Sequence, residues 1–131
     1  MSKKTSLITG CAGFIGSHLV NFLLNKNQKV IGIDNLCSGK SKNLKNAFKN
    51  KNFLFFRGDI KNIYKILKNK KIKIDYVFHL AGHGELIPSI EKPVEYFNNN
   101  AMNTVHLIDY EIKNHKIKKF IYAASSSCYG I

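Results

Sequence analysis

Residues 6–16 read Ser-Leu-Ile-Thr-Gly-Cys-Ala-Gly-Phe-Ile-Gly, and this stretch decides the fold. Its apolar start is followed by three glycines at intervals of three, Gly10, Gly13 and Gly16, and the run from Phe14 to Leu24 is amphipathic. Glycine lets a chain turn sharply and lets a helix start pack closely on a strand. The free backbone N–H groups at a helix start attract phosphate. The stretch therefore predicts a buried strand, a phosphate-binding turn and a helix.

The glycine spacing alone is weak evidence, because it is Gly-x-x-Gly-x-x-Gly and not the usual Gly-x-Gly-x-x-Gly of dinucleotide-binding turns. A plain strand-to-helix turn would also fit it. Asp34 strengthens the interpretation, since it ends the apolar run 31–34 at about the position of an acid that binds adenosine ribose. Such a carboxylate accepts hydrogen bonds from both ribose hydroxyls and repels a 2′-phosphate. NAD is therefore favoured over NADP, the alternative being that Asp34 only caps the loop after it.

Apolar and amphipathic segments alternate along the rest of the chain. Further strands are expected at 53–56, 76–80 and 120–124, and helices at 60–67 and 94–112. The second helix carries one apolar stripe, formed by Ala101, Val105, Ile108 and Ile112. Strands that are apolar almost throughout and alternate with helices predict an α/β fold, a Rossmann-like doubly wound parallel sheet with strand order 3-2-1-4-5. We expect residues 1–131 to form one dinucleotide-binding domain.

The net charge of +13 comes from 21 basic and 8 acidic residues. Such an excess can indicate a protein that binds nucleic acid. Here, however, Arg57 is the single arginine, and the lysines are scattered among asparagines without a concentrated patch of arginine or aromatic residues. A solvated lysine-rich surface is the simpler interpretation, so no nucleic-acid partner is expected.

The three cysteines, Cys11, Cys37 and Cys128, are far apart and match no metal-binding or disulfide pattern. Free thiols are typical of a reducing compartment, so we expect a cytoplasmic protein without a metal site. No uninterrupted apolar stretch of about 18 residues is present, and no N-terminal apolar run has the length of a signal peptide. We therefore expect no membrane association.

Six segments, taken in order, resemble the extended short-chain dehydrogenase/reductase family, and within it the NAD-dependent epimerases and dehydratases of nucleotide sugars. They are residues 9–16, 33–39, 58–60, 79–82, 95–104 and 124–130. The likeness spans essentially the whole chain and is greatest to the 4-epimerases of UDP-glucose and UDP-N-acetylglucosamine. Two places depart from the usual pattern, Asn103 where relatives often carry glycine and the stretch 83–85.

The resemblance implies a set of residues that bind NAD. The set is Gly10, Gly13, Phe14, Ile15, Gly16, Asp34, Asn35, Ser38, Gly39, Asp59, Ile60, Leu80, Ala81, Gly82 and Asn100. Within it, Asp34 and Asn35 would hold the adenosine ribose, Asp59 and Ile60 would flank the adenine, and residues 80–82 would lie on the nicotinamide side. For Asn100 the alternative is a surface polar residue.

The resemblance also implies that Ser125 is the catalytic hydroxyl, which shares the proton of the sugar 4-hydroxyl, and that Ser126 and Ser127 contact substrate. A serine-rich turn is the alternative. The family further uses a Tyr-x-x-x-Lys pair, in which lysine lowers the pKa of the tyrosine, on the helix that follows. The sequence ends before that helix, and the matching spacing at Tyr64 and Lys68 lies before the fourth strand, where we expect no catalytic role.

These features predict a NAD-dependent nucleotide-sugar 4-epimerase, which transfers hydride from sugar C4 to NAD⁺ and returns it to the other face. A 4,6-dehydratase is the less favoured enzyme, because dehydratases usually carry an acidic pair where Ser126 and Ser127 stand. A dinucleotide-binding module without catalysis is the remaining alternative. We expect the chain to be an N-terminal portion, inactive alone, that ends before the last strands and the substrate domain. The partners expected are a UDP-sugar or related nucleotide sugar and, through the long helix, a second copy in a homodimer.

Overall fold

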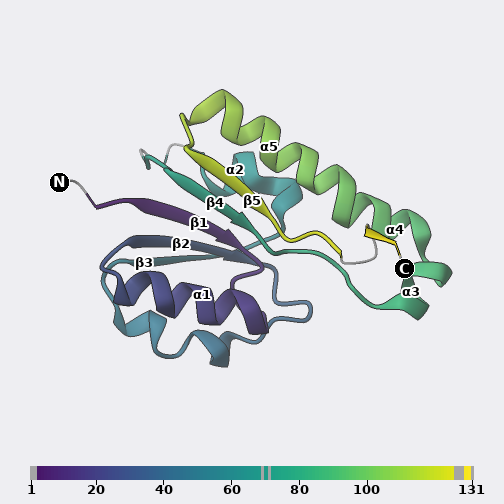
Figure 1. Cartoon of the computed structure of the whole chain (residues 1–131), viewed down its shortest axis with the longest axis horizontal. Coiled ribbons are helices and arrows are strands. Elements are labelled where there is room, and N and C mark those ends of the chain that lie inside the picture. The colour runs from purple at the N-terminus through teal and green to yellow at the C-terminus, as the bar shows by residue number, and fades with distance from the viewer. Residues whose placement is uncertain (1–2, 69, 71, 126–128, 131) are drawn as a thin grey trace.

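The computed structural model describes residues 3–68, 70, 72–125 and 129–130. Five parallel strands form one sheet in the order β3-β2-β1-β4-β5, which confirms the predicted order (Figure 1). The strands are β1 (Thr5–Thr9), β2 (Lys29–Asp34), β3 (Phe53–Arg57), β4 (Tyr76–His79) and β5 (Lys119–Tyr122). The sheet therefore places β1 at its centre and β3 and β5 at its edges.

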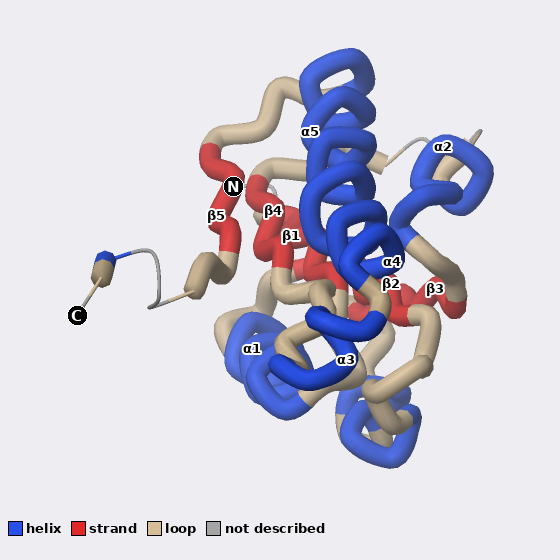
Figure 2. Tube along the Cα trace, turned by 90° about the vertical axis from the view of Figure 1, so that its right-hand side faces the viewer, coloured by secondary structure: helices blue, strands red, loops and turns tan. Residues whose placement is uncertain are grey.

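Helices cover both faces of the sheet, as the doubly wound prediction requires (Figure 2). One face carries α1 (Phe14–Asn25) and the 3₁₀ turns η1 (Ser41–Leu44) and η2 (Ala47–Lys49). The opposite face carries the 3₁₀ turn η3 (Ile60–Asn62), α2 (Ile63–Ile66) and α5 (Asn103–Asn114). Leu7 packs into the second layer and Ile8 into the first, because neighbouring side chains of a strand point to opposite faces.

Three segments differ from the expectation drawn from the sequence. The helix expected at 60–67 is a 3₁₀ turn followed by a single α-helical turn, η3 and α2. The lysine- and asparagine-rich stretch after β2 folds into η1 and η2, whose Leu44 and Ala47 are buried against α1. A short helix, α3 (Leu86–Glu91), follows β4 and was not predicted, because Pro88 and the exposed apolar residues around it give no amphipathic pattern.

The long helical segment after α3 is not a uniform α-helix. It consists of α4 (Pro93–Phe97), the π-helical turn η4 (Asn98–Met102) and α5. In η4 the N–H of Asn103 donates to the carbonyl of Asn98, five residues back, so the turn holds one residue more than an α-helical turn. Helices in the described part of the chain are all too short or too polar to cross a bilayer.

The apolar stripe of this segment faces away from the sheet. Val105 and Ile112 are 57% and 71% exposed, whereas Leu107 and Glu111 on the other side of α5 are completely buried. The residues of α5 that face the sheet therefore include several polar side chains, and the apolar ones point outward.

Candidate functional site

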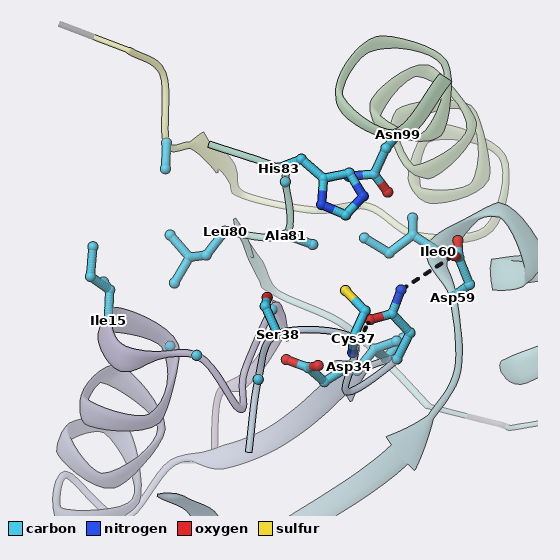
Figure 3. A pocket seen from close by; sticks show the side chains of 18 of the residues that line it. Ile15, Asp34, Cys37, Ser38, Asp59, Ile60, Leu80, Ala81, His83 and Asn99 are labelled. Carbon is cyan, nitrogen blue, oxygen red and sulfur yellow. Dashed lines mark hydrogen bonds between the residues drawn. The ribbon is translucent and has the colours of Figure 1, made fainter. Parts of the chain in front are cut away.

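A pocket of about 360 Å³ lies at the carboxyl ends of β1, β2 and β4 (Figure 3). The neighbouring strands β1 and β4 are followed by helices on opposite faces of the sheet. Ligands of open parallel sheets bind at such a switch point. Every residue of the expected cofactor set except Asn100 lines this single pocket. The fold has thus brought together residues from the first 82 positions of the chain.

The glycine turn between β1 and α1 forms one wall of the pocket. Gly10 has φ +67°, and a Cβ there would lie 2.8 Å from the backbone nitrogen of Ala81. A Cβ on Gly16 would overlap the carbonyl oxygen of Gly10, so helix and turn touch backbone to backbone. Gly13 is more open, with that oxygen its one near neighbour at 3.3 Å. Gly13 is the N-cap of α1 and offers no side chain to cap the helix, which suits an anionic ligand on the free N–H groups.

Asp34 ends β2 with its carboxylate against the glycine turn. Oδ2 accepts a hydrogen bond of 2.8 Å from the N–H of Ala12, and Oδ1 accepts one of 2.8 Å from the N–H of Leu36. Each carboxylate oxygen has a second lone pair for a ligand hydroxyl. A Cβ on Gly39 would lie 2.9 Å from Oδ1, so the glycine keeps this side of the carboxylate uncrowded. Asp34 therefore caps the loop after β2 and also lines the pocket. A role as a loop cap is thus compatible with a role in binding a ribose.

A second carboxylate, that of Asp59, lies across the pocket from the glycine turn. Its Oδ1 accepts a hydrogen bond of 3.0 Å from the N–H of Lys61 and one of 3.4 Å from Asn103 Nδ2. Its Oδ2 accepts a hydrogen bond of 3.4 Å from Asn35 Nδ2 (Figure 3). These contacts fix Asp59 between the loop after β2 and the start of α5, with Ile60 beside it in the lining.

The segment after β4 forms the remaining wall, and the buried ring of His79 lies behind it. The ring Nδ1 lies 2.6 Å from Thr9 Oγ1, and the ring Nε2 lies 2.8 Å from Thr104 Oγ1. Burial lowers the pKa of His79 to about 4, so the ring is neutral at physiological pH. The side chain of Asn100 makes two hydrogen bonds of 2.8 Å to the backbone of His83, one to its N–H and one to its carbonyl.

Two further site residues expected from the sequence, Asn100 and Ser125, do not line this pocket. Asn100 is outside the lining, with its amide on the backbone of His83, while its neighbour Asn99 lines the pocket. Ser125 is exposed and follows Ala123, the residue of this segment that reaches the lining. Ser126 and Ser127 lie outside the described residues.

Some lining residues were not expected from the sequence. They are Ile33, Cys37, Gly58, His83, Asn99 and Ala123. All of these except Ala123 directly adjoin expected residues in the chain, so extending each motif by one position would have found the other five. His83 stands at a departure from the family pattern, and its ring packs against Tyr96 with centroids 5.2 Å apart.

Tyr64 of the coincidental Tyr-x-x-x-Lys spacing lies away from this lining. Its hydroxyl donates a hydrogen bond of 2.7 Å to Asp109 Oδ2, and its ring packs edge-on against Tyr110. Both partners belong to α5, on the helical layer that covers the sheet. The described residues hold no cluster of three histidine, cysteine or acidic side chains that could bind a metal ion.

A parallel sheet of order 3-2-1-4-5, a glycine turn at the start of α1 and an acidic residue at the end of β2 together define a dinucleotide-binding α/β domain. The family model described as GDP-mannose 4,6 dehydratase matches residues 7–131. The chain accordingly belongs to this NAD-dependent epimerase/dehydratase family.

Curated relatives include both kinds of enzyme. A dTDP-D-glucose 4,6-dehydratase of Dictyostelium discoideum is 42% identical over 130 residues, and a UDP-glucose 4-epimerase of Pasteurella multocida is 37% identical over 129 residues. Each alignment covers 95% of this chain. The chain spans 29% and 37% of the two relatives' lengths.

Solved structures of epimerases have the same fold. A UDP-N-acetylglucosamine 4-epimerase from Methanobrevibacter ruminantium M1, in complex with UDP-N-acetylmuramic acid, matches with a TM-score of 0.85 and 39% identity. That match covers 99% of this chain and 40% of the other. A UDP-glucose 4-epimerase from Bifidobacterium longum, in complex with NAD⁺ and UDP, matches with a TM-score of 0.82 and 32% identity, over 97% of this chain and 38% of the other.

Proposed function

We propose that this chain is the NAD-binding part of a nucleotide-sugar 4-epimerase. The observation that carries the proposal is the position of Asp34, whose carboxylate lines a pocket that also holds the uncapped start of α1. An acid at this position favours a ribose with free 2′ and 3′ hydroxyls and disfavours a 2′-phosphate. The likeness to UDP-glucose and UDP-N-acetylglucosamine 4-epimerases supports the substrate class.

The residues of the pocket suit one orientation of bound NAD, with the adenosine at β2 and the nicotinamide at β4. The adenosine ribose would bind Asp34, with the adenine beside Asp59 and Ile60. The pyrophosphate would lie over Gly13, where the turn leaves room and the N–H groups of α1 are directed toward the ligand. The nicotinamide would then reach the wall at residues 80–82, at the end of β4.

The proposed chemistry needs a hydroxyl and a base near sugar C4. Bound NAD⁺ would supply the hydride acceptor and later the hydride donor at that carbon. We assign Ser125 as the hydroxyl that hydrogen-bonds to sugar O4 while its proton leaves, and Ser126 and Ser127 as substrate contacts. The proposal concerns the whole protein, because the chain spans less than half the length of its relatives.

A 4,6-dehydratase is the second candidate, and two observations favour it. The family model carries a dehydratase description, and a dehydratase relative is 42% identical. We prefer the epimerase to the dehydratase because of the sequence Ser125-Ser126-Ser127. Dehydratases of this family usually have an acidic pair after the catalytic hydroxyl. A carboxylic acid is the group that would protonate the departing hydroxyl so that it leaves as water, and serine is far too weak an acid for that step.

Product analysis separates the two reactions. The purified whole protein is incubated with NAD⁺ and one sugar nucleotide at a time: UDP-glucose, UDP-N-acetylglucosamine or dTDP-glucose. The sugars are followed by proton NMR. An epimerase inverts C4 of a UDP-sugar without loss of water. Formation of a 4-keto-6-deoxy sugar from any of the three would replace our assignment with the dehydratase.

Cofactor choice tests Asp34 directly. Calorimetry should give tighter binding of NAD⁺ than of NADP⁺, and Asp34→Asn should weaken NAD⁺ binding about tenfold, as expected for loss of a charged hydrogen-bond acceptor. Asp109→Asn, on the exposed surface of α5, is the matched control and should leave the affinity unchanged. Tighter binding of NADP⁺ than of NAD⁺ by the unmodified protein would contradict the proposal.

We also propose that the protein is a homodimer joined through α4 and α5. Val94 and Phe97 of α4 are 72% and 60% exposed, and Val105 and Ile112 of the α5 stripe are 57% and 71% exposed, so this segment offers exposed apolar side chains that two copies can share. A cytoplasmic location is supported by the described cysteines, Cys11 and Cys37, which are both free thiols.

A further inference from the structure

The inference concerns the hydrogen bonds behind the wall formed by residues 80–83, and its functional part rests on the proposed function. Thr104 Oγ1 donates a hydrogen bond of 2.6 Å to the carbonyl oxygen of Asn100, and this bond uses the only proton of the hydroxyl. Thr104 Oγ1 can therefore only accept from His79, whose Nε2 lies 2.8 Å away. Hydrogen-bond accounting thus assigns the proton of the neutral ring to Nε2.

The other side of the ring is fixed by the same reasoning. His79 Nδ1 then carries a lone pair, so Thr9 Oγ1, at 2.6 Å, donates to it. The lone pairs of that hydroxyl accept the N–H of Ala81 at 3.3 Å. The bonds therefore run in one direction, from Ala81 N–H through Thr9, His79 and Thr104 to the carbonyl of Asn100.

This chain of bonds and the side chain of Asn100 hold the wall and the residue before it. The chain of bonds holds the ring of His79, directly before the wall, and the N–H of Ala81 within it. The Asn100 amide holds both backbone groups of His83. The π turn η4 supplies Asn100, and Thr104 follows two residues after the turn, in α5. The groups come from β1, β4 and the η4–α5 segment, so the wall's position depends on all three.

We propose that His79 is a positioning residue, which as the Nε2-protonated tautomer ties Thr9 and Thr104 together and thereby fixes the pocket wall that meets the nicotinamide half of NAD. The adenosine half would meet Asp34 and Asp59, which lie at the carboxyl ends of β2 and β3, whereas the wall follows β4. Loss of a hydrogen bond to His79 should therefore weaken binding of the nicotinamide half more than binding of the adenosine half.

The tautomer is tested on the unmodified protein. Long-range ¹H–¹⁵N NMR of the ¹⁵N-histidine-labelled protein distinguishes a protonated from an unprotonated ring nitrogen. We expect one of the five histidines to show an Nε2-protonated neutral ring whose shifts stay constant from pH 6 to pH 8. His79→Gln should remove that signal and so assign it. An Nδ1-protonated or charged ring for His79 would overturn the proposal, whatever the protein catalyses.

The positioning role is tested with a pair of variants that differ in one group. Thr104→Val removes the hydroxyl with little change of shape, and Thr104→Ser keeps it. We expect Thr104→Val to weaken NAD⁺ binding about tenfold while ADP binding changes less than twofold, and Thr104→Ser to restore NAD⁺ binding. Thr9→Val and Thr9→Ser should repeat the pattern.

The outcomes separate this inference from the proposed function. If the unmodified protein binds ADP but gains no affinity from the nicotinamide half, the proposed NAD site itself is wrong. If NAD⁺ binds more tightly than ADP, and both valine variants weaken the two ligands equally or neither, the positioning role of His79 is wrong.

Discussion

Glu111→Gln should stabilise the protein at alkaline pH and not at acid pH. Glu111 lies on the sheet side of α5 with no exposed surface, and neither of its carboxylate oxygens has a hydrogen-bond partner among the described residues. Burial raises its pKa from 4.5 to about 7. Between these two pH values the folded protein keeps a proton that the unfolded chain releases, so the free energy of unfolding falls as the pH rises.

The size of the effect follows from the pKa change. One pKa unit corresponds to about 1.4 kcal/mol, so the rise to about 7 corresponds to a loss of about 3 kcal/mol, complete above pH 7. The glutamine side chain cannot ionise. The free energy of unfolding of Glu111→Gln minus that of the unmodified protein should therefore grow by about 3 kcal/mol from pH 5 to pH 8.5.

Urea denaturation followed by circular dichroism, at intervals across that range, measures this difference. Urea is preferred to guanidinium because it leaves the ionic strength unchanged. Glu91→Gln, at an exposed position of α3, is the matched control and should give a difference that does not vary with pH. A Glu111→Gln difference that stays constant within about 0.5 kcal/mol would refute the reasoning, since surface substitutions alone produce that much variation.

Three further predictions concern the glycine turn before α1, the hydrogen bond from Thr5 to Asp75 before β4, and the apolar stripe of α5. Gly16→Ala should lower the melting temperature and abolish NAD⁺ binding, because its Cβ would overlap the Gly10 carbonyl, whereas Gly84→Ala, which meets no atom within 4 Å, should change neither in a thermal-shift assay. Asp75→Asn should lower the free energy of unfolding by about 1 kcal/mol at pH 7, because Asp75 Oδ2 accepts a hydrogen bond of 3.0 Å from the Thr5 N–H. This bond holds the pKa of Asp75 below its ordinary value. The difference in the free energy of unfolding, measured by urea denaturation, should therefore disappear as the pH falls through that lowered pKa. Ile112→Lys should turn a dimer into a monomer in sedimentation velocity, and an unchanged sedimentation coefficient would contradict the proposed interface.

The strands and the cofactor pocket could be predicted because their signals are local. A buried parallel strand is apolar throughout, and the residue at its carboxyl end is directed to one edge of the sheet, so Asp34 and Leu80 could be assigned to the same pocket from their sequence positions. Gly10 and Gly16 were identifiable because a close backbone approach excludes other residues there.

The helix expected at 94–112 is present, but its π turn and its orientation could not be predicted from the sequence, because they depend on contacts between residues distant in sequence. Nothing local to Asn98–Met102 indicates a π turn, which depends on Asn100 reaching the backbone of His83 and on Thr104 reaching His79. Periodicity likewise identified an apolar stripe on α5 without showing which way it points. Glu111 reads in the sequence as a surface residue of an amphipathic helix, yet it is completely buried.

The π turn determines which side chains of this helical segment reach the pocket wall. Its extra residue sets Phe97 and Val105 eight positions apart where two α-helical turns need about seven, so the apolar residues before and after it stay in one line. Deleting Ala101 or Met102 would convert the π turn into an ordinary α-helical turn, which keeps α4 and α5 in line but shortens the spacing between Asn100 and Thr104. The bonds of Asn100 to the backbone of His83 and of Thr104 to His79 would then no longer be presented together. A deletion at these positions should therefore leave the outer stripe in line and release the pocket wall at His79 and His83.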